Sequence, residues 1–471
     1  MLNMNKTSFH DEFQILSKTL SHIFSAEYLE QTARDTGFVQ REGKLKAKDF
    51  LSLCTFLGDH SGQKTLNQLC STLDSYRDIN LSAEGLNQRF NEGAVAFIKK
   101  VFTDSLSRQI GECLGFSHAF DQYFDRIRIL DSSGFRLPDT CHGHYKGSSE
   151  PGVKIQLEYE LLKGNFIHLE VQDGRESDQT YGHAVVNTVE PRDLCLRDLG
   201  YFSFKDLERI KVKGAYYISR LHEKSAIYVK KDEGNTSKLT RKPVYVRVDL
   251  EKIMDQMKFG EMFEMEEVYV GYDQKFPTRL ILCKLTEDQT KQRLLMREKK
   301  EKKKGVKYSH QTKRLSALNI YITNIPEEFI TKQEVHELYS LRWQIEILFK
   351  TWKSLFNIHR MKKMKPERVE CHLYGTLLSL LVASMITFQI RFILYHKRGK
   401  ETSEFKGMSI VKEYFTKLHY AIFDRSSPIP SVITSIYRSI EKNGQKCHRY
   451  RKKTVFDILG IEYKKNCRYA S

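Results

Sequence analysis

The chain has 471 residues, a formal net charge of +18 at pH 7 and a hydrophobic content of 40%. At roughly 100–200 residues per domain, this length predicts several domains. The hydrophobic content excludes intrinsic disorder as the dominant state. The excess of basic residues predicts a polyanionic partner, and a nucleic acid fits better than a membrane surface.

The most apolar segment, residues 377–395, contains Gln389 and Arg391. These polar side chains favour a buried helix over a membrane span. No N-terminal segment has the pattern of a signal peptide, so we expect the nine cysteines to be reduced and structural. The sequence therefore predicts a cytoplasmic protein with no membrane partner.

Residues 1–118 show apolar positions at helical spacing and no good strand pattern. Residues 65–73 and 82–90 could form a helix-turn-helix, in which case Arg89 would face bases or phosphates. A plain helical bundle with solvated polar faces is the alternative. We expect this region to be an all-α domain that binds DNA.

Two aspartates follow short apolar segments in the next part of the chain. Residues 126–130 end at Asp131, and residues 194–197 end at Asp198. Between them, residues 153–171 alternate apolar and polar side chains around a Lys-Gly-Asn turn, which predicts a β-hairpin. Aspartate is common where strands end, so neither residue identifies a site alone.

Residues 223–325 contain several strand-like segments joined by polar connections. The charge run at residues 297–304 predicts a solvated helix face or a mobile loop, with a phosphate-contacting arm as the alternative. The basic tail, residues 397–471, could be a helical cap on the core or a contact surface for DNA and a second subunit.

A long helix is predicted for residues 331–356. One face carries apolar residues, and a narrow stripe beside it carries Tyr339, Arg342, Glu346 and Lys353, since the α-helix has about 3.6 residues per turn. A carboxylate between cations can stay ionised and bind Mg²⁺, while the cations hold phosphates. An internal Arg342–Glu346 salt bridge is the structural alternative.

A single glutamate cannot make a two-metal site, because two-metal phosphoryl transfer needs several converging carboxylates. Asp131 and Asp198, each placed at the end of an apolar segment, are the best candidates to join Glu346. The predicted order along the chain is strand and Asp131, hairpin, Asp198, helix, strand, insertion, and then the helix with Glu346.

This arrangement resembles the bacterial insertion-sequence transposases of the DDE type, specifically the IS-four family. The family signature is Tyr, two residues, Arg, three residues, Glu, six residues, Lys, and the chain matches it at Tyr339, Arg342, Glu346 and Lys353. The motifs ILDSSGF around Asp131 and RDLGYF around Asp198 also match. The resemblance covers about residues 120–395.

The resemblance implies an α/β fold in which a ribonuclease-H-like core is interrupted by a β-rich insertion. We expect a helical N-terminal domain at residues 1–118 and a basic helical C-terminal region at residues 397–471. Between them, the core occupies residues 119–222 and 326–396, and the β-rich insertion occupies residues 223–325.

The resemblance also implies that Asp131, Asp198 and Glu346 bind two Mg²⁺ ions, for which Mn²⁺ can substitute. Tyr339, Arg342, Lys353 and Arg220 would contact DNA. Some relatives stack a flipped base on a Trp in the insertion, but this chain has only Trp343 and Trp352. A Tyr or Phe would have to replace that Trp.

The expected function is DNA transposition in the bacterial nucleoid. The protein would bind the terminal inverted repeats of its element as a homodimer, cleave the ends and join the 3′ ends to target DNA. The alternatives are a related nuclease that performs no strand transfer and an inactive DNA-binding derivative.

Overall fold

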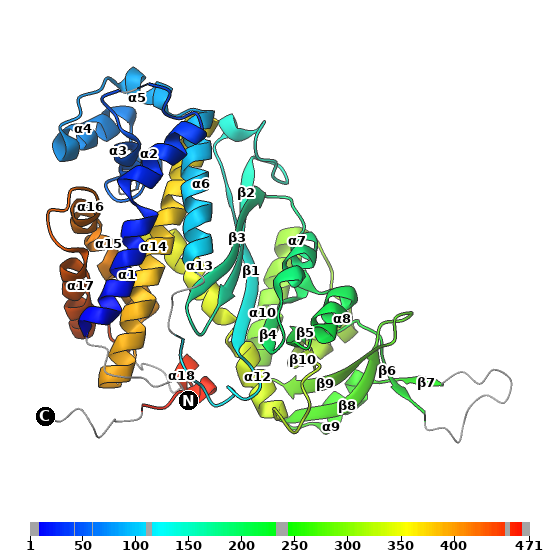
Figure 1. Cartoon of the computed structure of the whole chain (residues 1–471). Helices are drawn as coiled ribbons and strands as arrows, with labels where there is room; N and C mark the ends of the chain where they lie inside the picture. The colour runs from blue at the N-terminus through cyan, green and yellow to red at the C-terminus, as the bar shows by residue number, and fades with distance from the viewer. Residues whose placement is uncertain are drawn as a thin grey trace, which may run out of the picture.

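The computed structural model describes residues 9–41, 43–58, 60–109, 115–231, 244–447 and 453–463. Within these residues a ten-stranded mixed sheet forms the centre of the protein, in the order β3-β2-β1-β4-β5-β10-β9-β8-β6-β7. Helices cover both of its faces (Figure 1). The mixed α/β architecture is consistent with the expected ribonuclease-H-like core.

The first half of the sheet supplies the strands next to the two aspartates. Its strands are β1 (Arg126–Arg136), β2 (Gly152–Glu160), β3 (Asn165–Asp173), β4 (Asp193–Arg197) and β5 (Tyr216–Arg220). β1, β2 and β3 pair antiparallel, which confirms the predicted hairpin. β4 runs parallel to both β1 and β5.

The predicted insertion extends this sheet. It contributes β6 (Ile227–Lys230), β7 (Tyr245–Arg247), α9 (Leu250–Gln256), β8 (Met262–Val270), β9 (Phe276–Lys284), α10 (Glu287–Lys304), α11 (His310–Arg314) and β10 (Leu318–Thr323). β10 pairs antiparallel with both β5 and β9, so the β-rich part is continuous with the core sheet. The charge run at 297–304 lies within α10, and the mobile-loop alternative is therefore wrong.

Each face of the sheet has its own hydrophobic core, because successive side chains of a strand point to opposite faces. Leu196 belongs to the core that also contains residues of α12 (Lys332–Ser340), α13 (Trp343–Leu355) and α14 (Pro366–Arg398), whereas its neighbour Cys195 belongs to the core on the other face, which contains residues of α8 (Phe204–Val212). A short helix, α7 (Asp178–Val185), lies beside α8 (Figure 1).

The remaining helices come from the two ends of the chain. They are α1 (Phe9–Ile23), α2 (Ala26–Asp35), α3 (Ala47–Cys54), α4 (Leu66–Arg77), α5 (Ala83–Arg89), α6 (Glu92–Gln109), α15 (Glu404–Glu413), α16 (Phe415–Phe423), α17 (Ile429–Asn443) and α18 (Val455–Leu459). Among them, α3, α6, α15 and α17 pack on α14. α14 is apolar and long enough to cross a membrane, but its apolar window is entirely buried in the protein, as predicted.

One hydrophobic core joins the helices of both chain ends to the sheet. It contains Phe97 of α6, Leu196 of β4, Ile345 of α13, Leu377 of α14 and Ile433 of α17. The C-terminal helices therefore cap the core, which was one of the two alternatives for the tail. The N-terminal helices belong to the same packed body.

The contact between α3 and α14 is especially close. A Cβ atom added at Gly375 of α14 would lie 2.5 Å from the carbonyl oxygen of Cys54. Nearby, His419 of α16 is buried and bonds to Ser52 of α3. Burial is the main reason that the pKa of His419 falls to about 4, so this histidine is neutral at pH 7.

Candidate active site

The two aspartates lie on neighbouring parallel strands. The β1–β4 pairing runs from Arg126–Asp193 to Leu130–Arg197, and Asp131 and Asp198 are the next residues on the two strands. Their side chains are therefore at the same edge of the parallel part of the sheet. The prediction that the strand stops at Asp131 is wrong: β1 continues to Arg136, because β2 still pairs with it there.

The segment predicted as one helix over residues 331–356 is in fact two helices, α12 and α13, so the prediction of a single helix is wrong. At the junction the N–H of Arg342 donates to the carbonyl of Tyr339 (3.1 Å), and the N–H of Ile345 donates to Arg342 (3.3 Å). These i to i−3 bonds form a tight turn of 3₁₀ type, in which residues three apart are eclipsed. Tyr339 and Arg342 therefore point in nearly the same direction.

Arg342 connects the helix to the sheet. Its Nη1 donates to Asp131 Oδ2 at 3.0 Å, and its Nη2 donates to Glu346 Oε1 at 2.6 Å. The guanidinium is buried, with 8% of the residue exposed. One arginine thus holds a carboxylate of β1 and a carboxylate of α13 together, and the predicted Arg342–Glu346 ion pair is part of this larger bridge.

Tyr339 brings the third carboxylate into the group. Its hydroxyl donates to Asp198 Oδ1 at 3.2 Å, and only 7% of the residue is exposed. The aspartates lie on adjacent strands, and the helix residues contact both of them. Three acidic side chains that are far apart in the sequence therefore gather at one place.

The electrostatics of Asp131 reflect this gathering. Burial raises the pKa of its carboxyl to about 6, and the negative charges of Asp198 and Glu346 act in the same direction. The N–H of Ser132, at 2.8 Å from Asp131 Oδ1, and the charge of Arg342 oppose the rise. The cluster holds more negative charge than Arg342 alone offsets, and this environment favours a further cation.

The chemistry of the donors fits a hard divalent cation, because the cluster offers carboxylate oxygens and no thiolate or imidazole. Within the residues that the structure describes, no group of three or more His, Cys, Asp or Glu side chains lies close enough to hold a metal ion as arranged. In this arrangement the Arg342 guanidinium is the shared partner of Asp131 and Glu346.

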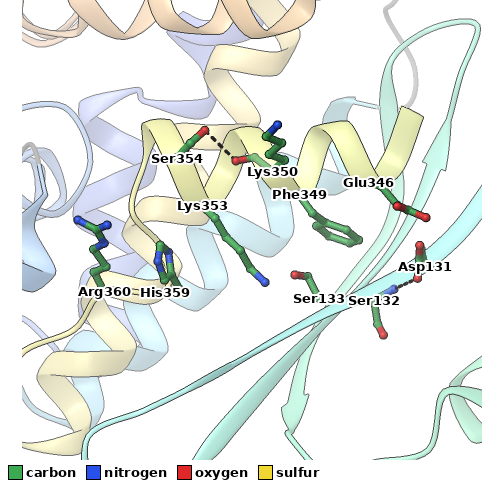
Figure 2. A pocket seen from close by; sticks show the side chains of 10 residues that line it. All are labelled: Asp131, Ser132, Ser133, Glu346, Phe349, Lys350, Lys353, Ser354, His359 and Arg360. Atoms are coloured by element: carbon green, nitrogen blue, oxygen red, sulfur yellow. Dashed lines mark hydrogen bonds between the residues drawn. The ribbon is translucent and has the colours of Figure 1, made fainter. Parts of the chain in front are cut away.

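A cavity of about 610 Å³ opens from this cluster along α13. Asp131 and Glu346 face each other at one end, Lys353 points from α13 toward β1, and His359 and Arg360 lie at the other end (Figure 2). The Lys353 ammonium donates to the carbonyl of Gly134 at 3.3 Å, and burial lowers its pKa. One end of the cavity is thus acidic and the other basic.

Several lining residues were not predicted from the sequence. They are Ser132, Ser133, Phe349, Lys350, Ser354, His359 and Arg360. The basic stretch that follows α13, residues 359–365, was the available signal, but nothing in its spacing shows that its first residues line the same cavity as the carboxylates. His359 is notable because its Nδ1 atom is buried and has no hydrogen-bond partner in the described part of the chain.

Of the five predicted DNA-contact residues, Lys353 lines this cavity, whereas Tyr339 and Arg342 are buried beside the carboxylates. The other two lie elsewhere. Arg220, at the end of β5, lines a second cavity that begins at Leu199. Arg89 is exposed on α5, which follows α4 in the predicted helix-turn-helix positions. Ser82 caps α5 by accepting from the N–H of Gly85. Both helices are confirmed.

The two tryptophans occupy different environments. Trp352 is buried in the core, whereas Trp343 is 60% exposed at the start of α13, with the Arg342 guanidinium 5.8 Å from its ring centre. An exposed aromatic ring therefore lies outside the insertion and beside Arg342, which bonds to Asp131 and Glu346.

Comparison with known proteins agrees with this geometry. The family model for the transposase DDE domain matches residues 122–382, which include both aspartates and Glu346. The chain belongs to the DDE transposases of bacterial insertion sequences. The family implies an enzyme that cleaves and transfers DNA strands, and DDE transposase domains generally use divalent metal ions.

Several similar proteins are themselves transposases, and two of the following three match more than nine-tenths of this chain. The transposase for insertion sequence element IS231D of Bacillus thuringiensis is 40% identical over 463 residues, which is 97% of each protein. The transposase for IS1151 of Clostridium perfringens is 34% identical over 96% of this chain and 97% of its own length. The transposase for IS421 of Escherichia coli is 23% identical over 79% of this chain and 92% of its own length.

Proposed function

We propose that this transposase cleaves the ends of its own insertion sequence at the Asp131, Asp198 and Glu346 cluster and joins the freed 3′ ends to target DNA. The observation that carries the proposal is the double contact of Arg342 with Asp131 and Glu346, together with the bond from Tyr339 to Asp198. Carboxylates from two strands and one helix meet there, as two-metal phosphoryl transfer requires.

The three carboxylates would hold two Mg²⁺ ions, or Mn²⁺ in their place. When bound, such a pair lowers the pKa of water and offsets charge on the attacking and leaving oxygens of a phosphodiester. Arg342 bonds to Asp131 and Glu346, which are two of the carboxylates that would hold the ions, so its guanidinium would give up bonds to them if the ions were bound there. Its guanidinium is then available to a phosphate oxygen, for which its planar fork is suited.

The basic end of the cavity is where the cleaved DNA strand would run. Lys353 lies between the acidic end and the basic end, so its ammonium can offset charge on the phosphate under attack. Lys350 and Arg360 continue the positive surface away from the carboxylates. Because each contact with a phosphate releases counterions, DNA binding to these basic residues weakens as the salt concentration rises.

Recognition of the terminal inverted repeats is assigned to the N-terminal helices. α4 and α5 are consecutive helices joined by residues 78–82, and the exposed side chains of Gln88 and Arg89 lie on the second helix. Two element ends must be held together for joining, so a homodimer is the expected active form on DNA.

The test is Glu346→Gln, assayed on duplex DNA that carries the element's own terminal inverted repeats in the presence of Mg²⁺. We expect cleavage to be lost while the affinity for the DNA ends changes less than about threefold, because the substitution keeps the shape of the side chain and removes its charge. Glu337→Gln is the matched control, since Glu337 of α12 pairs with Lys453 outside the site. Cleavage by Glu346→Gln at the wild-type rate would overturn the proposal.

A second assay separates strand transfer from cleavage alone. Pre-nicked end DNA with an exposed 3′ hydroxyl is incubated with plasmid and Mg²⁺. Joined products support the transposition step, whereas cleavage without joined products would identify a nuclease that performs no strand transfer. A wild-type protein that binds the ends and cleaves nothing would identify an inactive derivative.

A further inference from the structure

Asp178, the first residue of α7, is an acidic residue that the proposed chemistry does not use. Leu130 of β1 forms a small hydrophobic cluster with Tyr181 of α7, whereas its neighbour Ile129 belongs to the core that contains residues of α13. Successive side chains of a strand point to opposite faces of the sheet. α7 therefore covers the face opposite to the one that carries Glu346.

One oxygen of Asp178 accepts hydrogen bonds from three side chains. Its Oδ1 accepts from Ser132 Oγ at 3.1 Å, from Gln156 Nε2 at 3.0 Å and from the ammonium of Lys154 at 3.0 Å. Ser132 follows Asp131 in β1, and the other two donors lie on β2. Hydrogen bonds to an ionised group are roughly twice as strong as neutral ones. Asp178 thus connects the residue next to Asp131 to two side chains of the neighbouring strand.

The same network reaches the turn that follows Asp198. The hydroxyl of Tyr201 donates to Gln156 Oε1 at 2.5 Å, and the N–H of Tyr201 donates to the carbonyl of Asp198 at 3.1 Å. Tyr201 and Gln156 are both buried. A Cβ atom added at Gly200 would lie 3.4 Å from Asp178 Oδ2, so the backbone of this turn packs directly on Asp178.

The donors and acceptors of this network have defined directions. Burial and the negative charge of Asp178 raise the pKa of the Tyr201 hydroxyl, which therefore keeps its proton and donates. The amide of Gln156 then accepts from Tyr201 and donates to Asp178. A displacement of either end breaks a hydrogen bond of a buried group, which is costly. The network therefore resists movement of the residues next to both aspartates.

We propose that Asp178 is a positioning residue that sets the spacing between Asp131 and Asp198. It acts from the face of the sheet opposite to Arg342 and Tyr339, and it does not itself bind metal. Mg²⁺ requires near-ideal octahedral geometry, so a change in the spacing of the two aspartates weakens its binding. The proposal rests on the proposed function, since it takes these carboxylates to hold the cations.

The test measures metal binding separately from cleavage. MnCl₂ is titrated into the wild type and each variant by isothermal calorimetry without DNA, because Mn²⁺ takes the same kind of octahedral oxygen site as Mg²⁺. The Mg²⁺ concentration for half-maximal cleavage of inverted-repeat DNA is measured in parallel. Asp178→Ala removes the shared acceptor, and we expect both the Kd for Mn²⁺ and the half-maximal Mg²⁺ concentration to rise by about tenfold.

Two further variants divide the network. Asp178→Asn keeps an oxygen for the three donors and removes the charge, so we expect a rise of about threefold. Tyr201→Phe removes the link to the turn after Asp198 and leaves Asp178 in place, and we expect a rise of about three- to tenfold. Tyr181→Phe is the matched control, because Tyr181 lies in the same buried cluster and its hydroxyl forms no hydrogen bond within the described residues. It should leave both values unchanged.

Asp249→Ala separates a positioning role from a general loss of stability. Asp249 caps α9 in the insertion by accepting from the N–H groups of Glu251 and Lys252, so its loss lowers stability and leaves the metal dependence unchanged. If thermal unfolding shows that Asp178→Ala is less stable while its metal dependence is that of the wild type, the inference is wrong. Equal loss of Mn²⁺ binding in Asp178→Ala and Asp178→Asn would make Asp178 a metal ligand, and this also overturns it. Tyr201→Phe still tests the network if Asp178→Ala is poorly folded.

The two proposals fail differently. Wild-type protein that binds Mn²⁺ with these shifts in the variants but does not cleave inverted-repeat DNA would overturn the proposed function and leave the positioning role standing. Wild-type protein that cleaves its ends while Asp178→Ala and Tyr201→Phe keep the wild-type metal dependence would overturn only the positioning role. Wild-type protein that binds no Mn²⁺ would overturn the metal site and the positioning role together.

Discussion

Replacing Tyr339 with Phe removes one hydroxyl from the carboxylate cluster and leaves its packing intact. The hydroxyl donates to Asp198 Oδ1 at 3.2 Å and is buried. A hydrogen bond to a charged group contributes about 1.5–3 kcal/mol, and each 1.4 kcal/mol is tenfold in a rate or affinity. If the bond fixes Asp198 for catalysis, Tyr339→Phe slows end cleavage by about 10- to 100-fold.

A neighbouring tyrosine provides the matched control. The ring of Tyr321 lies 4.9 Å from that of Tyr339, and its hydroxyl bonds to His336 Nδ1 at 3.0 Å instead of to a carboxylate. Tyr321→Phe makes the same chemical change one ring away from Asp198. We expect it to leave the cleavage rate within about threefold of the wild type.

The assay is single-turnover cleavage of inverted-repeat DNA at saturating Mg²⁺, with end binding measured separately by anisotropy. The expected pattern for Tyr339→Phe is slow cleavage with nearly unchanged binding. The reasoning is refuted if Tyr339→Phe cleaves at the wild-type rate, or if it binds DNA more than about tenfold more weakly. Weak binding would mean that the hydroxyl contacts DNA and does not position Asp198.

Three further predictions concern metal, pH and packing. Chelation with EDTA abolishes cleavage and leaves end binding in place; cleavage that persists in EDTA would contradict the carboxylate mechanism. The pKa of His419 is about 4 in the folded protein and near 6.5 in the unfolded chain, so the unfolded chain binds more protons between these pH values. The free energy of unfolding therefore falls by up to about 3 kcal/mol as the pH drops from 6.5 to 4. Denaturant titrations should show a smaller loss of stability over this pH range in His419→Gln. Gly375→Ala forces a methyl group against Cys54 and lowers the free energy of unfolding by about 1–3 kcal/mol, as measured by thermal or denaturant unfolding. Gly143→Ala is the control, because no atom lies within 4 Å of the added carbon, and it leaves the free energy of unfolding unchanged.

The sequence predicted the elements of the site well because short-range patterns determine them. The hairpin of β2 and β3 follows from alternation around a glycine turn, and α12 and α13 follow from their shared apolar stripe. Leu338, Ile345 and Trp352 of that stripe are all buried. The motif spacing around Glu346 carried the family resemblance, which the comparisons confirm.

The features that the sequence did not predict depend on contacts between distant residues. The break at Arg342 coincides with its bridge to Asp131, 211 residues away. The extension of β1 beyond Asp131 depends on β2, and the joining of the insertion to the core sheet depends on β10 pairing with β5. Local propensity contains none of this information. The metal ligation and the DNA contacts remain predictions.

The shared packing around α14 has a consequence for how such an enzyme can diversify. The N-terminal helices proposed to recognise the element ends are not joined to the core by a linker, because α3 and α6 pack directly on α14, which shares one hydrophobic core with α13. An exchange of residues 1–118 between relatives would place N-terminal helices against a core whose packing surface evolved with different helices. New end specificity in this lineage is therefore expected to arise through substitutions at the outer surface of α4 and α5, one side chain at a time, rather than through the shuffling of whole modules.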